Sequence, residues 1–265
     1  MLCFPNAKIN LGLQVAVKRE DGFHNLRSVF YPIPLYDVVE FKKSAQYNLT
    51  VWGQNKTDLS QNNLITKAWE MVRHTFNIPP QEIHLLKNIP EASGLGGGSA
   101  DALFFLKEIL KHHNLKITEK KLLQMAARLC SDCSFFVHNK PAYVIGRGHV
   151  VEPVQFSLKG YYCLLVLPQK QISTREAFQK IVPKAPQYNL KKLVLEKDFE
   201  RWRAELFNDF ESVLPHNLLT IKEQLYKAGA LYASLTGSGS AFYGIFDKKP
   251  PNLNLFNEKV IVLEL

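Results

Sequence analysis

Residues 90–102 read Pro90-Glu91-Ala92-Ser93-Gly94-Leu95-Gly96-Gly97-Gly98-Ser99-Ala100-Asp101-Ala102, with three adjacent glycines immediately before a helical pattern. Glycine adopts positive φ without strain and lets an anion approach the backbone without interference from a Cβ atom. The free N–H groups and the dipole at the start of a helix favour a phosphate at the same place. A turn that merely starts a helix needs one glycine, so the additional glycines favour a phosphate loop whose geometry suits a triphosphate.

The two commonest nucleotide-binding motifs do not fit this loop. A P-loop places a lysine directly after its glycines, whereas Ser99 stands at that point. A dinucleotide-binding loop follows the first strand of its domain, whereas these glycines lie in the middle of the chain. Both assignments therefore fail.

Strand and helix patterns surround the glycines. Residues 7–18 alternate between apolar and polar side chains, which predicts a half-buried strand. Residues 29–41, interrupted by Pro32 and Pro34, predict a strand, a bend and a second strand. Further helices are expected at 63–76, 99–113 and 119–130, the last capped by Thr118, and further strands at 82–89, 142–145, 161–167, 231–235 and 241–246.

The second half of the chain changes character, because residues 173–229 are predominantly helical in pattern. We place a boundary near residue 155, which divides the chain into an N-terminal lobe, residues 1–155, and a C-terminal lobe, residues 156–265. The sequence therefore predicts an α+β protein of two lobes.

The chain has 265 residues and a formal net charge of +9, which favours anionic partners. Such partners include nucleic acid, an acidic membrane face and phosphorylated metabolites. The lysines are spread along the chain, with no arginine-rich block and no recognisable nucleic-acid module. A solvated basic surface is therefore expected, with neither a nucleic acid nor a membrane as partner. The sequence leaves the oligomeric state open.

Four cysteines, Cys3, Cys130, Cys133 and Cys163, are too few and too scattered for a disulfide framework. Cys130 and Cys133 have CxxC spacing, but a structural zinc site needs a second ligand pair, which the other two cysteines do not supply. We also find no apolar run long enough to cross a bilayer and no signal-peptide pattern in residues 1–6. A cytoplasmic protein in a reducing compartment is expected.

Three motifs resemble those of the GHMP small-molecule kinases. Residues 90–102 look like the second signature of that family, Ala7-Lys8-Ile9-Asn10-Leu11 resembles the first, and Ser234-Leu235-Thr236-Gly237-Ser238-Gly239-Ser240 resembles the third. The motifs occur in the family's order and span nearly the whole chain. The resemblance implies a two-lobe fold, with an N-terminal lobe similar to domain 2 of ribosomal protein S5 and an α/β ferredoxin-like C-terminal lobe. It also implies phosphoryl transfer from ATP, with Mg²⁺ carried along with the nucleotide.

Further segments resemble one branch of this family, whose substrate is a methylerythritol linked to a cytidylyl group. The opening motif is followed by Asp21-Gly22-Phe23-His24 and residues 26–30, and this combination is more specific than the glycines. Residues 63–65, 129–137 and 208–211 also match the branch. The resemblance implies transfer of the γ-phosphoryl group of ATP to the 2-hydroxyl of the methylerythritol moiety, on the non-mevalonate route to isoprenoid precursors.

The resemblance also implies a catalytic pair, Asp132 and Lys8. Phosphoryl transfer requires positioning, positive charge around the γ-phosphate and a base beside the attacking hydroxyl. Asp132 is the expected base, between a helix end and the strand-like residues 135–137. Lys8 is expected to hold both this carboxylate and the substrate hydroxyl. Without the resemblance, Asp132 would count as a helix-terminal cap and Lys8 as a solvated lysine at a strand start.

The same resemblance assigns binding roles. His24 is expected to hydrogen-bond the cytosine and Phe30 to stack on it, with Phe178 on the opposite face, because stacking gains ~1–3 kcal/mol per base. The expected substrate site also includes Asn10, Phe23, Thr236, Gly237 and Gly239. The expected ATP-binding residues are Asn63, Pro90, Gly94, Leu95, Gly96, Gly97, Gly98 and Ser99. Ser99, first in the predicted helix, would contact a phosphate or Mg²⁺ or act as a plain N-cap, and Asn63 would approach the adenine.

Some residues depart from the family's pattern. Around the expected base, Cys130, Ser131, Cys133 and Ser134 stand where the family has small residues and a proline, so the shape of the site is expected to differ there. Phe23 stands where tyrosine is common, and residues 91–93 replace a more glycine-rich run.

Two alternative functions remain open at this point. Another kinase of the same superfamily, acting on homoserine, mevalonate or a sugar, would keep the glycine loop but not the nucleotide contacts of Phe23, His24 and Phe30. A nucleic-acid-binding protein would instead bind RNA or DNA with an affinity that falls steeply with salt, and it would not turn over ATP.

Overall fold

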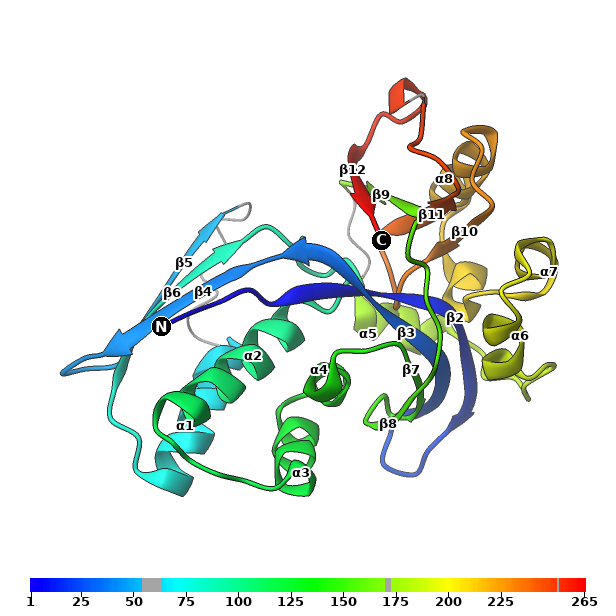
Figure 1. Ribbon diagram of the computed structural model, residues 1–265. Coiled ribbons are helices and arrows are strands. Elements are labelled where there is room, and N and C mark those ends of the chain that lie inside the picture. The colour runs from blue at the N-terminus through cyan, green and yellow to red at the C-terminus, as the bar shows by residue number, and fades with distance from the viewer. Residues whose placement is uncertain (54–62, 170–172, 252) are drawn as a thin grey trace. The chain divides into compact units, whose positions relative to one another are not determined.

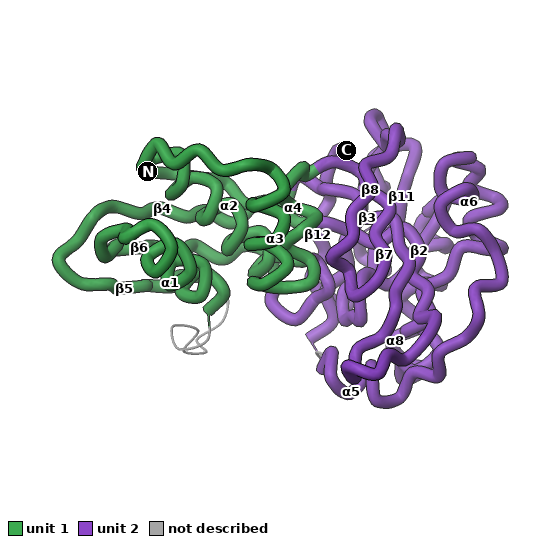
Figure 2. The backbone as a smooth tube through the Cα atoms, turned by 90° about the horizontal axis from the view of Figure 1, so that it is seen from below, with its two compact units in different colours: residues 1–7, 35–90, 96–139 green, residues 8–34, 91–95, 140–265 purple. Residues whose placement is uncertain are grey.

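The computed structural model describes residues 1–53, 63–169, 173–251 and 253–265 (Figure 1). It divides into two compact units, and each unit combines segments from distant parts of the chain (Figure 2). Unit 1 consists of residues 1–7, 35–90 and 96–139, and unit 2 of residues 8–34, 91–95 and 140–265. The division of the sequence at residue 155 stays a prediction.

Unit 1 holds a four-stranded sheet with its helices. The strand order is β1 (Leu2–Cys3), β4 (Val38–Lys43), β6 (Gln81–Lys87) and β5 (Asn48–Gly53), with β5 and β6 parallel. The helices are α1 (Leu64–Phe76), α2 (Gly97–His112), α3 (Glu119–Leu129) and α4 (Phe135–His138), with a 3₁₀ turn η1 (Asp132–Ser134) before the last. Helices α1 and α2 pack against each other on one side of this sheet (Figure 1).

Unit 2 contains two four-stranded antiparallel sheets. One has the order β2 (Asn6–Lys18), β3 (His24–Tyr36), β7 (Ala142–Gly146) and β8 (Val150–Pro153). The other has the order β10 (Tyr232–Leu235), β11 (Phe242–Phe246), β9 (Tyr162–Leu167) and β12 (Lys259–Glu264). The helical elements are α5 (Thr174–Lys180), α6 (Leu190–Glu196), α7 (Phe199–Glu205), η2 (Asp209–Val213), α8 (His216–Lys227) and η3 (Leu253–Leu255).

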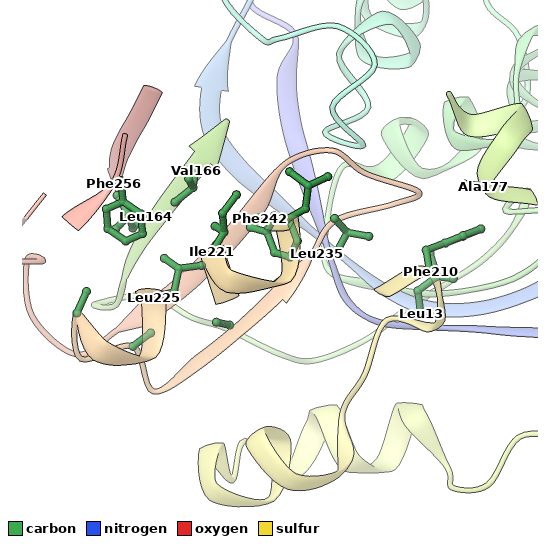
Figure 3. Packing of buried hydrophobic residues seen from close by; sticks show 14 of the residues in the cluster. Leu13, Leu164, Val166, Ala177, Phe210, Ile221, Leu225, Leu235, Phe242 and Phe256 are labelled. Carbon is green, nitrogen blue, oxygen red and sulfur yellow. The ribbon is translucent and has the colours of Figure 1, made fainter. Parts of the chain in front are cut away.

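A buried apolar cluster joins the second sheet of unit 2 to its helices (Figure 3). Leu164 of β9 and Phe242 of β11 meet Ile221 and Leu225 of α8 in this cluster. Phe210 of η2 belongs to the same cluster. The sheet and α8 thus provide a fixed base for the loop between β10 and β11, residues 236–241.

Strand β2 confirms the strand predicted for residues 7–18, but it is buried on both faces over most of its length rather than half-buried. The polar side chains of Lys8, Asn10 and Gln14 are all 4% exposed or less. Buried polar groups are normally hydrogen-bonded, and Lys8 and Asn10 bond each other here. Alternation in the sequence identifies the polar face but cannot show that other polar groups cover it.

Strand β3 runs through Pro32 and Pro34, where the sequence predicted a bend. Its pairing with β7 covers Leu26 to Phe30, so the prolines lie beyond the part that has this neighbour. Proline lacks an N–H group and is tolerated where a strand has no partner on that side. The chain instead turns at Asp37, which is fully buried between β3 and β4.

Two further elements differ from what the sequence led us to expect. Residues 135–137 lie in helix α4 and are not strand-like. All three are buried, and an unbroken apolar run does not by itself distinguish a helix from a strand. Strand β12 was not predicted, and it pairs with β9 along its whole length. Among the helices of the described residues, none combines the length and the apolar character that a membrane span requires.

Candidate active site

The glycine loop leads into helix α2, and its glycines differ in conformation. Gly94 and Gly96 have φ of 79° and 74°, the left-handed region that favours glycine. Gly97 and Gly98 are already the first residues of α2, so Ser99 is the third residue of the helix. The sequence had predicted Ser99 as the first residue, which is wrong. The helix extends back over these two glycines, which brings its free N–H groups into the loop itself.

Gly97 and Gly98 have different surroundings. A Cβ atom on Gly97 would lie 2.9 Å from Cγ2 of Ile89 and 3.1 Å from Nζ of Lys87, so a side chain does not fit there. Gly98 is exposed, and the nearest atom to its Cβ position among the described residues is Cδ1 of Leu64, at 4.0 Å. Packing therefore explains Gly97, whereas Gly98 leaves open space at the helix start that a ligand can use.

A buried charge cluster supports the start of α2 in unit 1. Nζ of Lys87 lies 2.8 Å from Oδ2 of Asp101 and also bonds Asp37. Asp37 accepts further hydrogen bonds from the backbone N–H groups of Asn88, at 2.6 Å, and Ile89, at 2.8 Å. The cluster thereby ties the end of β6 to the first turns of α2.

The protonation of this cluster follows from two carboxylates sharing one ammonium group. Burial raises the pKa of Asp101 well above its usual range despite the attraction of Lys87, and the negative charge of Asp37 adds to the increase. Burial alone would lower the pKa of Lys87, but the two carboxylates outweigh it and the pKa is raised. Lys87 therefore stays protonated.

Asp132 begins the turn η1, which packs against helix α2 within unit 1. Sγ of Cys133 lies 3.7 Å from the carbonyl oxygen of Ser99. Asp132 itself is half-buried. Unit 1 thus brings the turn of the expected base to the start of the helix that follows the glycine loop. Lys8 belongs to unit 2, and its pairing with Asp132 stays a prediction.

Cys130 and Cys133 form a disulfide across this turn, with their Cα atoms 5.3 Å apart. The CxxC spacing is compatible with half of a zinc site, but the sequence supplies no second pair of ligands. Among the described residues, no group of three or more His, Cys, Asp and Glu side chains is arranged to hold a metal ion. The bond joins the residues on either side of Ser131 and Asp132.

Lys8 lies in unit 2 with the side chains of the first motif. Its Nζ donates a hydrogen bond of 2.6 Å to Oδ1 of Asn10 and lies 4.4 Å from the ring centroid of Phe30. Its backbone N–H bonds the carbonyl oxygen of Leu95, at 2.9 Å. The lysine is only 2% exposed. A strand position, an amide and an aromatic face therefore hold the ammonium group in place.

Asn10 connects the first motif to the third. Its Oδ1 accepts hydrogen bonds from the N–H of Gly237, at 2.9 Å, and from Oγ1 of Thr236, at 3.2 Å. Its Nδ2 donates to Oγ of Ser28, at 3.0 Å. The expected substrate residue is therefore also a structural link between Lys8 and the loop after β10.

The second and third motifs meet at their backbones in unit 2. A Cβ on Gly94 would lie 2.0 Å from the carbonyl oxygen of Thr236, and a Cβ on Gly237 would lie 2.9 Å from Cα of Gly94. The N–H of Ala241 bonds the carbonyl oxygen of Ser93, at 3.1 Å. Glycine is required at both positions because the backbones of these two segments touch.

The aromatic residues expected around the cytosine separate into two places. The rings of His24 and Phe178 stack at 5.2 Å with an interplanar angle of 29°. Phe30 lies under the ammonium group of Lys8. Burial, aided by the charge of Lys18, lowers the pKa of His24, so its ring is neutral near pH 7.

The remaining expected residues are placed as follows. Phe23 is half exposed, and the guanidinium of Arg147 lies 4.9 Å from its ring. Asn63 caps α1, with Oδ1 accepting from the N–H of Ile65 at 2.9 Å. The N–H of Gly239 bonds the carbonyl oxygen of Thr236, at 3.1 Å, which closes the loop after β10. Pro90 is half-buried in unit 1, directly before the glycine loop.

Sequence reasoning missed the residues that support the loops. Lys87 counted only as one of many lysines, and Asp37 fell in the second strand predicted for residues 29–41. Asn208 matched a family pattern but received no role. The available signal was the position of Lys87, which follows the apolar residues of a predicted strand immediately before the loop.

A glycine loop at a helix start, an aspartate turn packed on that helix and a second glycine loop define a small-molecule kinase. Models of the GHMP kinases match the chain in two places, the N-terminal domain over residues 63–140 and the C-terminal domain over residues 190–256. The chain is also similar to curated proteins named 4-diphosphocytidyl-2-C-methyl-D-erythritol kinase. One from Bacteroides thetaiotaomicron is 44% identical and covers 93% of this chain and 92% of its own. One from Parabacteroides distasonis is 45% identical, and the match covers 94% of this chain and 92% of the relative.

Solved structures agree with these relatives. A crystal structure of 4-(cytidine 5'-diphospho)-2C-methyl-D-erythritol kinase has a TM-score of 0.75 and 26% identity and covers 92% of this chain and 90% of its own. A mevalonate kinase from Methanococcus jannaschii has a TM-score of 0.67 at 13% identity, which shows a shared fold alone. The chain belongs to the GHMP kinases and, within them, to the family of 4-diphosphocytidyl-2-C-methyl-D-erythritol kinases. It is an ATP-dependent kinase with the GHMP fold that the sequence predicted.

Proposed function

We propose that this kinase transfers the γ-phosphoryl group of ATP to the 2-hydroxyl of 4-diphosphocytidyl-2-C-methyl-D-erythritol, within the non-mevalonate route to isoprenoid precursors. A bond forms between the hydroxyl oxygen and the γ-phosphorus, and the bond to the β–γ bridging oxygen breaks. ADP leaves, and the proton of the hydroxyl passes to the carboxylate of Asp132. The names of the relatives support this acceptor.

The observation that carries the proposal is the contact of η1 with the start of α2. The turn of Asp132 lies against the helix whose first N–H groups face the glycine loop, with Sγ of Cys133 at 3.7 Å from the carbonyl oxygen of Ser99. A base beside a phosphate-binding helix start is what phosphoryl transfer to a hydroxyl requires. In this proposal Asp132 accepts the proton, and the loop of Gly94 to Ser99 binds the phosphates.

Lys8 supplies positive charge in the proposed reaction. Its ammonium group is buried and held by Asn10 and Phe30, so it needs no reorganisation when charge develops on the transferred group. We assign it to the γ-phosphoryl oxygens and the attacking hydroxyl, opposite Asp132. Asn63 and Pro90 complete the proposed ATP site, the former towards the adenine.

Recognition of the cytidylyl group is assigned to His24 and Phe178. Their stacked rings form an aromatic surface in unit 2, and the neutral imidazole of His24 can hydrogen-bond a base edge. Phe23 flanks this surface in the proposal. Phe30 is also assigned to stacking on the cytosine, and Lys8 lies over one face of its ring. Asn10, Thr236, Gly237 and Gly239 bind the acceptor beyond the base.

Mg²⁺ enters this proposal with ATP. The described residues offer no cluster of three carboxylate, histidine or cysteine ligands, which fits a metal that is held mainly by phosphate oxygens and water. The hydroxyl of Ser99 is the donor from this chain that would contribute to its shell. The bound metal would neutralise charge on the transferred phosphate.

The proposed partner is a small-molecule acceptor, with neither nucleic acid nor membrane, and the proposed compartment is the cytoplasm. Thiols there are kept reduced, so we expect the disulfide of Cys130 and Cys133 seen in the structure to be mainly reduced to a dithiol in that compartment. The proposed chemistry uses neither sulfur atom. We therefore expect full activity with the pair reduced.

A coupled assay for ADP release tests the acceptor. We expect turnover with the cytidylyl-linked methylerythritol and a loss of about 5- to 150-fold in kcat/KM when methylerythritol phosphate, which lacks the cytidylyl group, replaces it, because the base-stacking energy is lost. Equal turnover of both compounds, or preference for homoserine, mevalonate or a sugar, would reject the proposed acceptor while leaving the kinase class intact.

Asp132→Asn tests the proposed base. We expect kcat to fall by about 10²–10⁴-fold with the KM for ATP within about twofold, because a general base acts in the transition state more than in binding. Asp198→Asn is the control, since Asp198 is an exposed N-cap of α7 and asparagine caps equally well. An unchanged kcat for Asp132→Asn would remove the base from the mechanism.

A further inference from the structure

A short segment, residues 208–211, holds several parts of unit 2 at once. Asn208 is 1% exposed, and its Nδ2 donates hydrogen bonds to the carbonyl oxygens of Leu235, at 3.0 Å, and Gly237, at 2.8 Å. Its Oδ1 accepts from the N–H of Phe210, at 3.0 Å. This pattern requires both the donor and the acceptor of an amide, which fixes the orientation of the side chain.

The neighbouring side chains bind two other strands. Oδ2 of Asp209 accepts from the N–H of Val15 in β2, at 2.7 Å. Oε1 of Glu211 accepts from the N–H of Leu235, at 3.0 Å, and its Oε2 bonds Nζ of Lys222, at 2.7 Å. The segment therefore connects β2, which carries the first motif, to the end of β10, where the third motif starts.

Phe210 extends the connection to the aromatic surface. Its ring packs edge-on against Phe178 at 4.8 Å, and Phe178 stacks on His24. Phe210 is itself anchored in the apolar cluster of unit 2 (Figure 3). One four-residue segment thus contacts both the loop after β10 and the aromatic pair assigned to the acceptor.

Gly237 is held from two sides. Its N–H donates to Asn10, and its carbonyl oxygen accepts from Asn208. Glycine-rich segments lose the most conformational freedom on ordering, so a loop with Gly237 and Gly239 stays in one conformation only if other groups hold its backbone. The backbone N–H and C=O groups of Gly237 are thus held by the buried side-chain amides of Asn10 and Asn208.

We propose that Asn208 is a positioning residue, which keeps the loop of residues 236–240 in the conformation that binds the phosphoryl acceptor. The proposal rests on the proposed function, because it takes the acceptor to contact this loop. In this proposal Asn208 contacts neither the acceptor hydroxyl nor the γ-phosphorus. It acts through the carbonyl oxygens of Leu235 and Gly237. An amide is needed because a carboxylate at this position cannot donate to either carbonyl.

Asn208→Asp isolates these two donated hydrogen bonds. The variant keeps the size of the side chain and the acceptor for the N–H of Phe210, but it directs a carboxylate oxygen at two carbonyl oxygens. We expect the KM for the acceptor to rise at least about tenfold while the KM for ATP stays within about twofold. A role in stability alone would lower the thermal midpoint without separating the two KM values.

Asn189→Asp is the matched control. Asn189 caps α6 at an exposed position, where only its Oδ1 is used, so the same substitution keeps the cap. We expect wild-type values of both KM constants and of the melting temperature for this variant. Asn208→Ser provides a second test at the site, because serine still caps the N–H of Phe210 but does not reach the carbonyls.

Hydrogen exchange tests the positioning without any acceptor. In Asn208→Asp, the amides of residues 236–241 should exchange at least about tenfold faster, while those of strand β9 stay unchanged. Unchanged exchange in this loop, or equal increases in both KM values, would overturn the proposal. Loss of the folded state in both Asn208 variants would also overturn it, since the residue would then hold the unit together.

The outcomes separate this inference from the proposed function. If the wild-type chain phosphorylates a different hydroxyl compound, the proposed acceptor is wrong, and the KM measurements are made with the compound that it does phosphorylate. If the proposed acceptor is correct and Asn208→Asp has wild-type KM values with unchanged loop exchange, only the positioning role fails.

Discussion

The two glycine-rich segments of this kinase are supported by different chemistry. In unit 1, the start of α2 rests on a buried charge cluster of Lys87, Asp37 and Asp101. In unit 2, the loop after β10 is held by the neutral amides of Asn10 and Asn208. In unit 1, Ile89 and Lys87 occupy the space that a Cβ on Gly97 would need. In unit 2, the two glycine-rich segments occupy this space for each other, at Gly94 and Gly237.

The two kinds of support respond differently to change. A buried ion pair that loses one partner leaves an uncompensated charge and costs about 3–5 kcal/mol. A neutral hydrogen bond that loses its donor costs about 1–3 kcal/mol when the acceptor stays buried. Helix α2 is therefore expected to depend on charge balance, and the loop after β10 on the geometry of its hydrogen-bond donors.

Lys87→Met should have the largest effect on stability, because it leaves Asp37 and Asp101 buried without their ammonium group. We expect the free energy of unfolding to fall by about 3–5 kcal/mol. Urea denaturation at pH 7 measures this change. Lys42→Met is the control, since Lys42 is exposed and its ion pair with Glu82 lies at the surface. A loss below about 1 kcal/mol for Lys87→Met would show that the charge cluster does not support the fold.

Gly94→Ala should be the next most damaging change. Its Cβ would lie 2.0 Å from the carbonyl oxygen of Thr236, and its φ of 79° is unfavourable for alanine. Overpacking costs about 1–3 kcal/mol, with strain in addition. Gly160→Ala separates the two effects, because Gly160 has a φ of 88° and its Cβ position is in open space among the described residues. Equal losses for both variants would disprove the close contact.

Gly98→Ala tests the open space at the start of α2. We expect the melting temperature to stay within about 2 °C, because the nearest described atom to its Cβ position is 4.0 Å away. The KM for ATP should nevertheless rise about tenfold, since the proposed site brings a phosphate close to the backbone there. Gly97→Ala should instead lower stability through its contact with Ile89. An unchanged KM for Gly98→Ala would argue against phosphate binding at this residue.

The smallest expected effect concerns His24 and pH. Its folded-state pKa is below the usual value near 6.5, so the unfolded chain binds a proton first as the pH falls. The contribution of His24 to stability is then complete above about pH 6.5 and is lost as the pH falls through the lower folded value. We expect the KM for the acceptor to rise less than about tenfold over this range, since a protonated ring loses its acceptor nitrogen. His24→Gln should remove that part of the pH profile.

The fold could be predicted from the sequence where local pattern and burial agree. The helix at residues 63–76, capped by Asn63, and the strand at residues 231–235 appear as expected. The bend at Pro32 and Pro34 was wrong, because β3 continues through both prolines, which lie beyond the part that pairs with β7. The strand-like character of residues 135–137 was wrong because a fully apolar run carries no periodicity.

The glycines and the residue types of the expected site were evident in the sequence, because conformational freedom and charge are properties of single residues and their neighbours in the chain. Only the tertiary structure decided which groups support them. Lys87, Asp37 and Asp101 come together from separate segments, as do Asn10, Gly237 and Asn208. Hydrogen bonds and ion pairs act over a few ångströms in space, and separation along the chain carries no information about which distant residues are brought within that reach.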